Sequence, residues 1–206
     1  MAVGTRSRTK TGGIREVRRL ETRARLFDAA VAEIDRAGLA GADVSAIATA
    51  AGVVRGTFYF HFPTKEHVLI ELERNEEARI VEELSGSEID PGDLVAVLSL
   101  LVRRVVAAEQ RLGRTVFRDM LGLHFSATRP AEDQLAEHPL AEFVIAAIGD
   151  AQQAGRVPAD QDAGELGMFF LTGLFALLAT GTHDLGTASA VLDRYVTTVV
   201  KGIESR

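Results

Sequence analysis

Apolar side chains recur every three or four residues along most of this 206-residue chain, and this spacing limits the fold more than any other feature. The first clear run contains Leu26, Ala30 and Ile34, which would share one face of a helix. Glycines and prolines separate the successive runs, and no segment alternates apolar and polar residues as a half-buried strand does. The sequence therefore predicts an all-α protein.

The expected helices fill the stretches between these breaks. They cover residues 21–38, 44–51, 55–60, 65–84, 93–112, 115–128, 139–155, 161–180 and 187–203. Asp43 is placed to cap the second of them, because an aspartate oxygen can accept a bond from the free N–H groups of a first turn. Gly52 follows this helix, and a glycine there permits the positive φ of a tight turn.

Four segments are expected from the same reading. Residues 1–20 are basic and rich in Gly, Ser and Thr, which indicates a flexible arm. Residues 21–66 form a compact helical domain, 67–84 a connecting helix, and 85–206 a second helical domain. The polar stretch Ser85–Gly92 contains Gly and Pro and marks the expected boundary.

Composition argues against several classes of enzyme. The chain has no cysteine, which excludes disulfides, thiolate catalysis and cysteine zinc sites. Its five histidines show neither His-x3-His nor HExxH spacing, and there is no P-loop, GxSxG or GxGxxG motif. We therefore expect no catalytic residues, no cofactor and no metal, and we interpret the paired acidic residues Glu76-Glu77 and Glu82-Glu83 as solvated helix faces.

Charge is divided unevenly along the chain. Residues 1–65 hold 11 Lys or Arg against 6 Asp or Glu, whereas residues 66–206 hold 12 against 23. A phosphate backbone responds to the local field, so a basic end on an acidic body is compatible with nucleic-acid binding. The basic start Met1–Arg25 lacks the apolar core of a secretory signal, and the charge-free stretch Leu166–Thr182 is short for a membrane span. These features predict a cytoplasmic protein with no membrane partner.

Residues 45–66 read Ser-Ala-Ile-Ala-Thr-Ala-Ala-Gly-Val-Val-Arg-Gly-Thr-Phe-Tyr-Phe-His-Phe-Pro-Thr-Lys-Glu. Two short helices joined by Ala51-Gly52-Val53 predict a helix-turn-helix. The segment closely resembles the N-terminal DNA-binding domain of the TetR family of bacterial transcriptional repressors. The resemblance is strong over 22–72 and continues to the C-terminus as helix order and spacing.

The resemblance implies contacts with double-stranded DNA from one group of residues. They are Ser45, Arg55, Gly56, Thr57, Tyr59, Phe60, His61 and Lys65. Small groups at the start of a recognition helix let the backbone approach the major groove, and we expect Tyr59 and Lys65 to reach phosphates. Two positions depart from the family: Val54 replaces a Ser or Thr, and Phe60 stands where a second aromatic hydroxyl is common. Both changes remove polar contacts, for which the basic arm could compensate.

In the family the second half is a helical ligand-binding and dimerisation domain. Residues 161–180 are apolar around most of a helix, so they need cover on both sides, and a second copy of the chain would supply it. The expected dimer interface includes Phe169, Gly173, Phe175, Leu177, Val191 and Tyr195. The alternative is that this helix is buried entirely within one subunit.

A cavity for an apolar or amphipathic effector is the second expectation for this half. Its expected lining is Val102, Val106, Gln110, Phe117, Met120, Leu121, His124, Phe125 and Phe143. Each of these could instead simply fill a core, and His124 could be a hydrogen-bonded core histidine. The function that we expect is a repressor released from a palindromic operator by a small molecule. The alternatives are a regulator whose body binds another protein and, less favoured, an all-helical enzyme.

Overall fold

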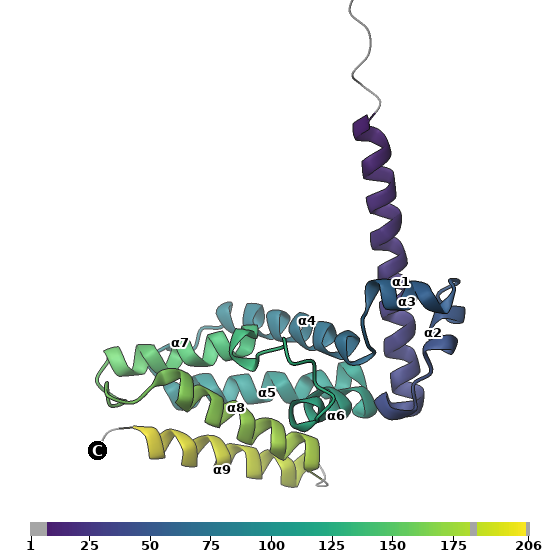
Figure 1. Cartoon of the computed structure of the whole chain (residues 1–206). Coiled ribbons are helices and arrows are strands. Elements are labelled where there is room, and N and C mark those ends of the chain that lie inside the picture. The colour runs from purple at the N-terminus through teal and green to yellow at the C-terminus, as the bar shows by residue number, and fades with distance from the viewer. Residues whose placement is uncertain (1–7, 182–184, 205–206) are drawn as a thin grey trace, which may run out of the picture. The chain divides into compact units, whose positions relative to one another are not determined.

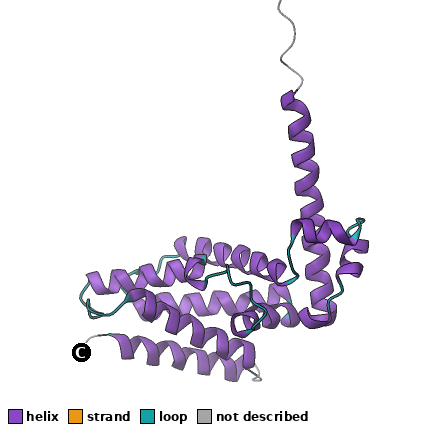
Figure 2. Cartoon of the chain, in the orientation of Figure 1, coloured by secondary structure: helices purple, strands orange, loops and turns teal. Residues whose placement is uncertain are grey.

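The computed structural model describes residues 8–181 and 185–204, and within these ranges it contains helices and no strand (Figure 2). The all-α prediction is therefore confirmed. The chain divides into two compact units, Met1–Val68 and Leu69–Arg206.

The N-terminal unit contains α1 (Arg8–Gly41), α2 (Val44–Ala50) and α3 (Arg55–His61). Helix α1 begins at Arg8, so the part of the expected flexible arm that the structure describes is helical; residues 1–7 lie outside the described residues. Residues 13–20 are exposed, and Glu16 binds Arg19 one turn away, which supports a helix that has no buried face. Apolar spacing could not reveal this extension.

Local signals in the helix-turn-helix behave as the sequence predicts. Gly38 has φ +71° and interrupts the helical conformation near the end of α1. The backbone N–H of Ser45 donates to Asp43 Oδ1 at 2.8 Å, so Asp43 caps α2. Gly52 has φ +69° in the turn before α3, a conformation that costs glycine little. The apolar faces meet in a core that contains Leu26, Ala30, Ile47, Phe58, Phe62 and Val68.

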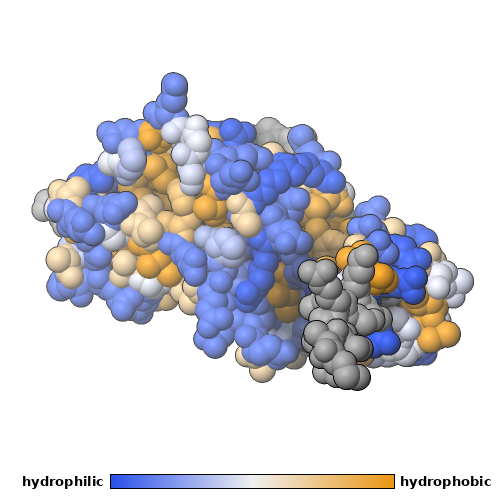
Figure 3. All heavy atoms as spheres, turned by 90° about the horizontal axis from the view of Figure 1, so that it is seen from above, coloured by the Kyte–Doolittle hydropathy of each residue, from blue (hydrophilic) through white to orange (hydrophobic). Residues whose placement is uncertain are grey.

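The C-terminal unit takes in α4, apart from its first residues, and five more α-helices. The bounds are α4 (Glu66–Ser85), α5 (Leu94–Leu112), α6 (Arg114–Gly122), α7 (Pro139–Gln153), α8 (Ala163–Thr180) and α9 (Leu185–Ile203), with 3-10 helices η1 (Leu123–Phe125) and η2 (Leu135–Glu137). Helix α8 packs against α6 and α7, while α9 packs against α5 and α8 (Figure 1). Hydrophilic and hydrophobic residues are interspersed on the face drawn in Figure 3.

Two boundaries differ from the expected ones. The division between the units falls at residue 68 rather than near residue 85, because α4 is tied into the C-terminal unit by side chains distant in sequence. Arg74 pairs with Asp133 at 2.9 Å, and Glu76 pairs with Arg111 at 2.8 Å. The helix expected over 115–128 ends at Gly122 and continues as one turn of 3-10 helix.

Helix α8 is the one helix within the described ranges that is long and apolar enough to cross a membrane. In the structure it forms part of the helical core, yet its buried residues are only Gly167, Phe170, Leu171, Leu174 and Phe175. Phe169 on the same helix is 63% exposed. The chain by itself therefore covers one side of α8 and leaves the other open.

A glycine controls how α8 and α9 approach each other. The Tyr195 hydroxyl donates to the Phe170 carbonyl at 2.6 Å, and the two rings stack at 5.6 Å. Burial of this hydroxyl raises the pKa of Tyr195 to about 12, which keeps it a donor. A Cβ added at Gly173 would overlap the Tyr195 hydroxyl and lie 3.0 Å from its Cζ. The contact therefore requires glycine on α8.

We expect Gly173→Ala to reduce the free energy of unfolding by about 1–3 kcal/mol, because Tyr195 must give up its hydrogen bond and stacking position. Thermal denaturation at fixed protein concentration measures the effect, at about 2–4 °C per kcal/mol. Gly149→Ala is the matched control, since a Cβ there meets nothing within 4 Å and alanine favours the helix. Equal melting temperatures for Gly173→Ala and the unmodified chain would contradict the role of this glycine.

Candidate nucleic-acid interface and ligand cavity

Helix α3 divides its residues between the core and the surface. Phe58 is buried and its ring lies 5.7 Å from that of Phe62, which anchors the helix. On the outer face Tyr59 is 45% exposed and Phe60 is 74% exposed. A Cβ added at Gly56 would meet nothing within 4 Å, so the surface is open at the first turn. The outer face of α3 is thus free to approach another molecule.

Three of the predicted DNA-contacting residues meet on this surface. Arg55 Nη2 donates to the Tyr59 hydroxyl at 3.2 Å, and Nη1 lies 3.5 Å from the hydroxyl of Ser45 on α2. These contacts bring a guanidinium and two hydroxyls together from the two helices of the motif. Val54, where the family usually has Ser or Thr, is the N-cap residue of α3 and makes no side-chain hydrogen bond to the helix.

The other predicted contacts have less uniform surroundings. Thr57 and His61 are partly buried, and burial together with Arg19 and Arg23 lowers the pKa of His61. Lys65 has a role that the sequence did not suggest: its ammonium donates to the carbonyls of Ala40 at 3.1 Å and Ala42 at 3.2 Å. These bonds satisfy backbone acceptors at the end of α1. Its contact with phosphate remains a prediction.

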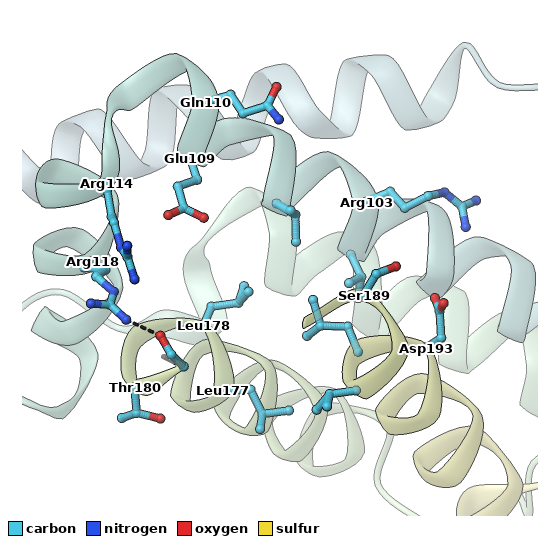
Figure 4. Close-up of a pocket in the computed structure, with 15 residues that line it drawn as sticks. Arg103, Glu109, Gln110, Arg114, Arg118, Leu177, Leu178, Thr180, Ser189 and Asp193 are labelled. Carbon is cyan, nitrogen blue, oxygen red and sulfur yellow. Dashed lines mark hydrogen bonds between the residues drawn. The ribbon is translucent and has the colours of Figure 1, made fainter. Parts of the chain in front are cut away.

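The C-terminal unit contains a cavity of about 810 Å³ between α5, α6, α8 and α9 (Figure 4). Its lining is Val102, Arg103, Val106, Glu109, Gln110, Arg114, Arg118, Leu177, Leu178, Thr180, Gly181, Ser189, Val191, Leu192 and Asp193. Of the residues expected to line a pocket, Val102, Val106 and Gln110 do so. Leu177 and Val191, expected at the dimer interface, also face this cavity.

The remaining expected pocket residues lie elsewhere. Phe117, Met120 and Leu121 are buried in the core, where they line a separate small cavity of about 20 Å³. Phe125 is 52% exposed, and Phe143 is partly buried on α7. The sequence argument selected apolar residues of α5 and α6, but their inner faces are filled by core packing. Apart from Gln110, it therefore missed the polar and charged residues of the larger cavity.

The large cavity is lined by both charged and apolar side chains. Arg114 and Arg118 lie together at one end of it, whereas Arg103 and Asp193 lie at the other (Figure 4). Arg118 also donates to the carbonyl of Gly181. Valines of α5, leucines of α8, and Val191 and Leu192 of α9 supply apolar surface to the same lining. The cavity thus offers an apolar wall with guanidinium groups beside it, which suits an amphipathic molecule with an anionic group.

The residues expected at a dimer interface differ in their exposure and contacts. Phe169 is exposed, as an interface requires, while Gly173 and Tyr195 contact each other inside the chain. Phe175 is the clear correction: it is 1% exposed, and its ring lies 4.6 Å from that of His124. A helix that is apolar on all sides does not reveal which side its own chain will cover.

A buried polar cluster lies in the same unit, away from the large cavity. Glu73 and Glu77 of α4 are buried beside His138, which precedes α7, and Glu73 binds His124. Burial raises the pKa of Glu73 well above its usual value, and the charge of Glu77 adds to this effect. Burial and the charge of Arg129 lower the pKa of His124 to about 3. The interpretation of Glu77 as part of a solvated face is therefore wrong.

Comparison with known proteins agrees with this architecture. Residues 26–72 match the model of the bacterial regulatory proteins of the tetR family. The chain is 34% identical over 87 residues to the transcriptional regulator AcrR of Shigella flexneri, and 30% identical over 135 residues to the transcriptional repressor SCO4008 of Streptomyces coelicolor. These alignments cover 42% and 65% of this chain, and 40% and 66% of the relatives' own length.

Solved structures share the whole fold. Thermus thermophilus FadR, a TetR-family transcriptional repressor in complex with lauroyl-CoA, has a TM-score of 0.70 and 22% identity, with 89% of this chain and 96% of that chain covered. RolR in complex with resorcinol has a TM-score of 0.65 and 18% identity, with 92% and 90% covered. The match over the helix-turn-helix and the two bacterial relatives show that the chain belongs to the TetR family of bacterial regulatory proteins.

Proposed function

We propose that the chain is a cytoplasmic transcriptional repressor, which binds a palindromic operator as a homodimer and is released by an amphipathic anion. The observation that carries this proposal is the outer face of α3, where Arg55, Tyr59 and Ser45 meet beside the open Gly56. Recognition helices use such a face to reach base edges and phosphates in the major groove. The excess of basic residues over 1–65 adds attraction to any phosphate backbone.

A homodimer is supported by the uncovered side of α8. The exposed Phe169 and Thr172 lie three residues apart, so they share one face of the helix, and Phe169 carries apolar surface that water would otherwise contact. A second copy of the chain would cover this face by a two-fold arrangement. Two recognition helices would then read two related half-sites.

An effector is supported by the size and chemistry of the large cavity. At about 810 Å³ it is within the range of small-molecule sites, and its guanidinium groups could bind a carboxylate or a phosphate. Related folds hold lauroyl-CoA in FadR and resorcinol in RolR. We therefore expect an acyl chain or similar apolar body with an anionic group.

Release from DNA requires a path from the cavity to the recognition helices. Helix α4 runs from Glu66, within the N-terminal unit, to Ser85, so it connects the two units covalently. It is bound to α5 through the pair Glu76–Arg111, and Arg111 lies next to Gln110 of the cavity wall. A ligand that favours one position of α5 would shift α4 and change the half-site spacing that the dimer fits.

A second candidate function has the same DNA surface but a C-terminal unit that binds another protein. The exposed Phe169 would support it equally well. The size of the cavity favours the small-molecule reading, and the experiments below separate the two.

For DNA binding, the purified chain should select an inverted repeat from a pool of random-sequence duplexes. We expect Arg55→Ala to weaken binding to the selected site roughly 5–150-fold and to relax the preference at one position of each half-site. Tyr59→Phe should weaken binding to all sequences alike, because it removes a phosphate contact. Arg79→Ala is the control, since Arg79 lies on α4 and pairs with Glu83. Failure to select any sequence would contradict the operator proposal.

For dimerisation, sedimentation velocity at micromolar concentration should show a dimer. Phe169→Asp should give a monomer, because a carboxylate would be buried at the centre of the uncovered face. Phe125→Asp removes another exposed phenylalanine from a different element, η1, and should leave the dimer intact. A monomer for the unmodified chain, or a dimer that survives Phe169→Asp, would count against the α8 interface.

For the effector, a fatty carboxylate should raise the melting temperature of the chain more than the alcohol of equal length. Arg114→Gln should reduce this difference, whereas Arg79→Gln, at a residue that does not line the cavity, should preserve it. The same carboxylate should weaken operator binding by 5–150-fold, which corresponds to a coupling of about 1–3 kcal/mol. Stabilisation without any change in operator affinity would leave the cavity as a site unconnected to DNA release, and the protein-binding alternative would gain support.

A further inference from the structure

Three buried side chains in the C-terminal unit converge without forming ordinary hydrogen bonds to one another. Glu73 and Glu77 are one turn apart on α4, and His138 precedes the first residue of α7. Their exposed fractions are 1%, 4% and 0%. Two carboxylates in a protein interior are costly unless charge and hydrogen bonds compensate them, so this arrangement needs a physical explanation.

The atoms that face each other are ones that can donate an electron pair. His138 Nδ1 lies 3.2 Å from Glu77 Oε2 and 4.0 Å from Glu73 Oε2. One such atom from each of the three residues lies within 4.8 Å of the others. Within the described residues, His138 Nδ1, Glu73 Oε2 and both oxygens of Glu77 have no partner in hydrogen-bond geometry. Atoms bound to one metal ion at roughly 2.0–2.2 Å lie roughly 3–4 Å apart, so small side-chain shifts would close the set.

The outer contacts of His138 indicate which of its nitrogens carries the proton. Nε2 lies 2.9 Å from Asp133 Oδ1, and Asp133 is bound in turn by Arg74 and Arg129. A carboxylate paired with two guanidinium groups accepts hydrogen bonds, so Nε2 is the N–H donor. In the neutral ring with its proton on Nε2, Nδ1 carries a lone pair and faces the two glutamates. This carboxylate–histidine pairing is the one that orients metal-binding histidines in proteins.

Glu73 is oriented in a similar way. Its Oε1 is bound by His124 Nε2, and the other ring nitrogen of His124 is bound by Arg129. Each carboxylate oxygen of Glu73 thus has a separate role: Oε1 is held by a histidine, and Oε2 faces His138. Ligating carboxylates are commonly held by hydrogen bonds of this kind.

The two arginines nearest this cluster are bound to a third carboxylate. Arg74 and Arg129 both pair with Asp133. A divalent cation would compensate both glutamates at once.

We propose that Glu73, Glu77 and His138 bind a divalent transition-metal ion, with Asp133 and His124 orienting the ligands. One imidazole nitrogen and carboxylate oxygens suit Zn²⁺ better than Mg²⁺ or Ca²⁺, which prefer oxygen alone. None of the three ligands lines the large cavity, so this is a second site and does not depend on the proposed effector. Such an ion would fasten α4 to the start of α7.

The test uses the full-length chain after treatment with a chelator and gel filtration. Titration with Zn²⁺ in competition with a chromophoric chelator should show one tight site per chain. Glu77→Gln, Glu73→Gln and His138→Gln should each weaken this site by more than 10-fold, and Asp133→Asn by 10–100-fold through loss of the orienting bond. Glu82→Gln is the matched control, because it changes an exposed carboxylate on the same helix. Mg²⁺ at equal concentration should not compete.

Two further measurements keep the result decisive if a variant folds poorly. Circular dichroism identifies such a variant, and Co²⁺ absorption of the unmodified chain then reports coordination directly. An intense visible spectrum that is displaced by one equivalent of Zn²⁺ supports the site. Absence of stoichiometric binding by the unmodified chain, or binding that persists in all three ligand variants, would overturn the proposal and leave a purely structural polar cluster.

Discussion

The C-terminal unit depends on the need to remove an 18-residue apolar helix from water. Helix α8 packs against α6, α7 and α9, and its inner residues, among them Phe170, Leu171 and Leu174, form the centre of the core. Two details follow from this demand. Gly173 lets the Tyr195 ring approach α8 closely enough to reach a backbone carbonyl, and Phe169 is left outside because none of the described helices packed on α8 covers it. The same constraint therefore explains both the packing of α9 and the surface proposed for a partner copy.

Helix α4 buries both apolar and acidic side chains. Leu69, Leu72, Ile80 and Leu84 are buried as a helix of this unit requires. Glu73 and Glu77 are buried between them, where hydrocarbon side chains would have packed without an electrostatic cost. Asp133, His124 and His138 lie around these two carboxylates. The metal ion proposed above would offset the electrostatic cost of burying them.

In the N-terminal unit, one face of α3 packs in the core and the opposite face is exposed. Phe58 and Phe62 fix α3 to the core, and this anchoring allows Arg55, Tyr59 and Phe60 to remain exposed on the opposite side. Lys65 bonds to the carbonyls at the end of α1, which stabilises the unit that presents the recognition surface. Rigid support of this kind reduces the conformational entropy lost when such a surface binds.

Local chemistry was readable from the sequence because it acts over a few residues. Helical spacing, the Asp43 cap, the glycine turn at Gly52 and the helix-turn-helix motif all follow from neighbouring side chains, and the structure has each of them. The exposed extension of α1 escaped this reading, since it has no apolar face to detect. What only the tertiary structure decided were the contacts between residues far apart in the chain. The burial of Phe175, the arginines of the large cavity and the meeting of Glu73 and Glu77 with His138 depend on how the helices pack. Helix packing is set by the sum of many weak contacts, so no short sequence pattern encodes which faces will meet.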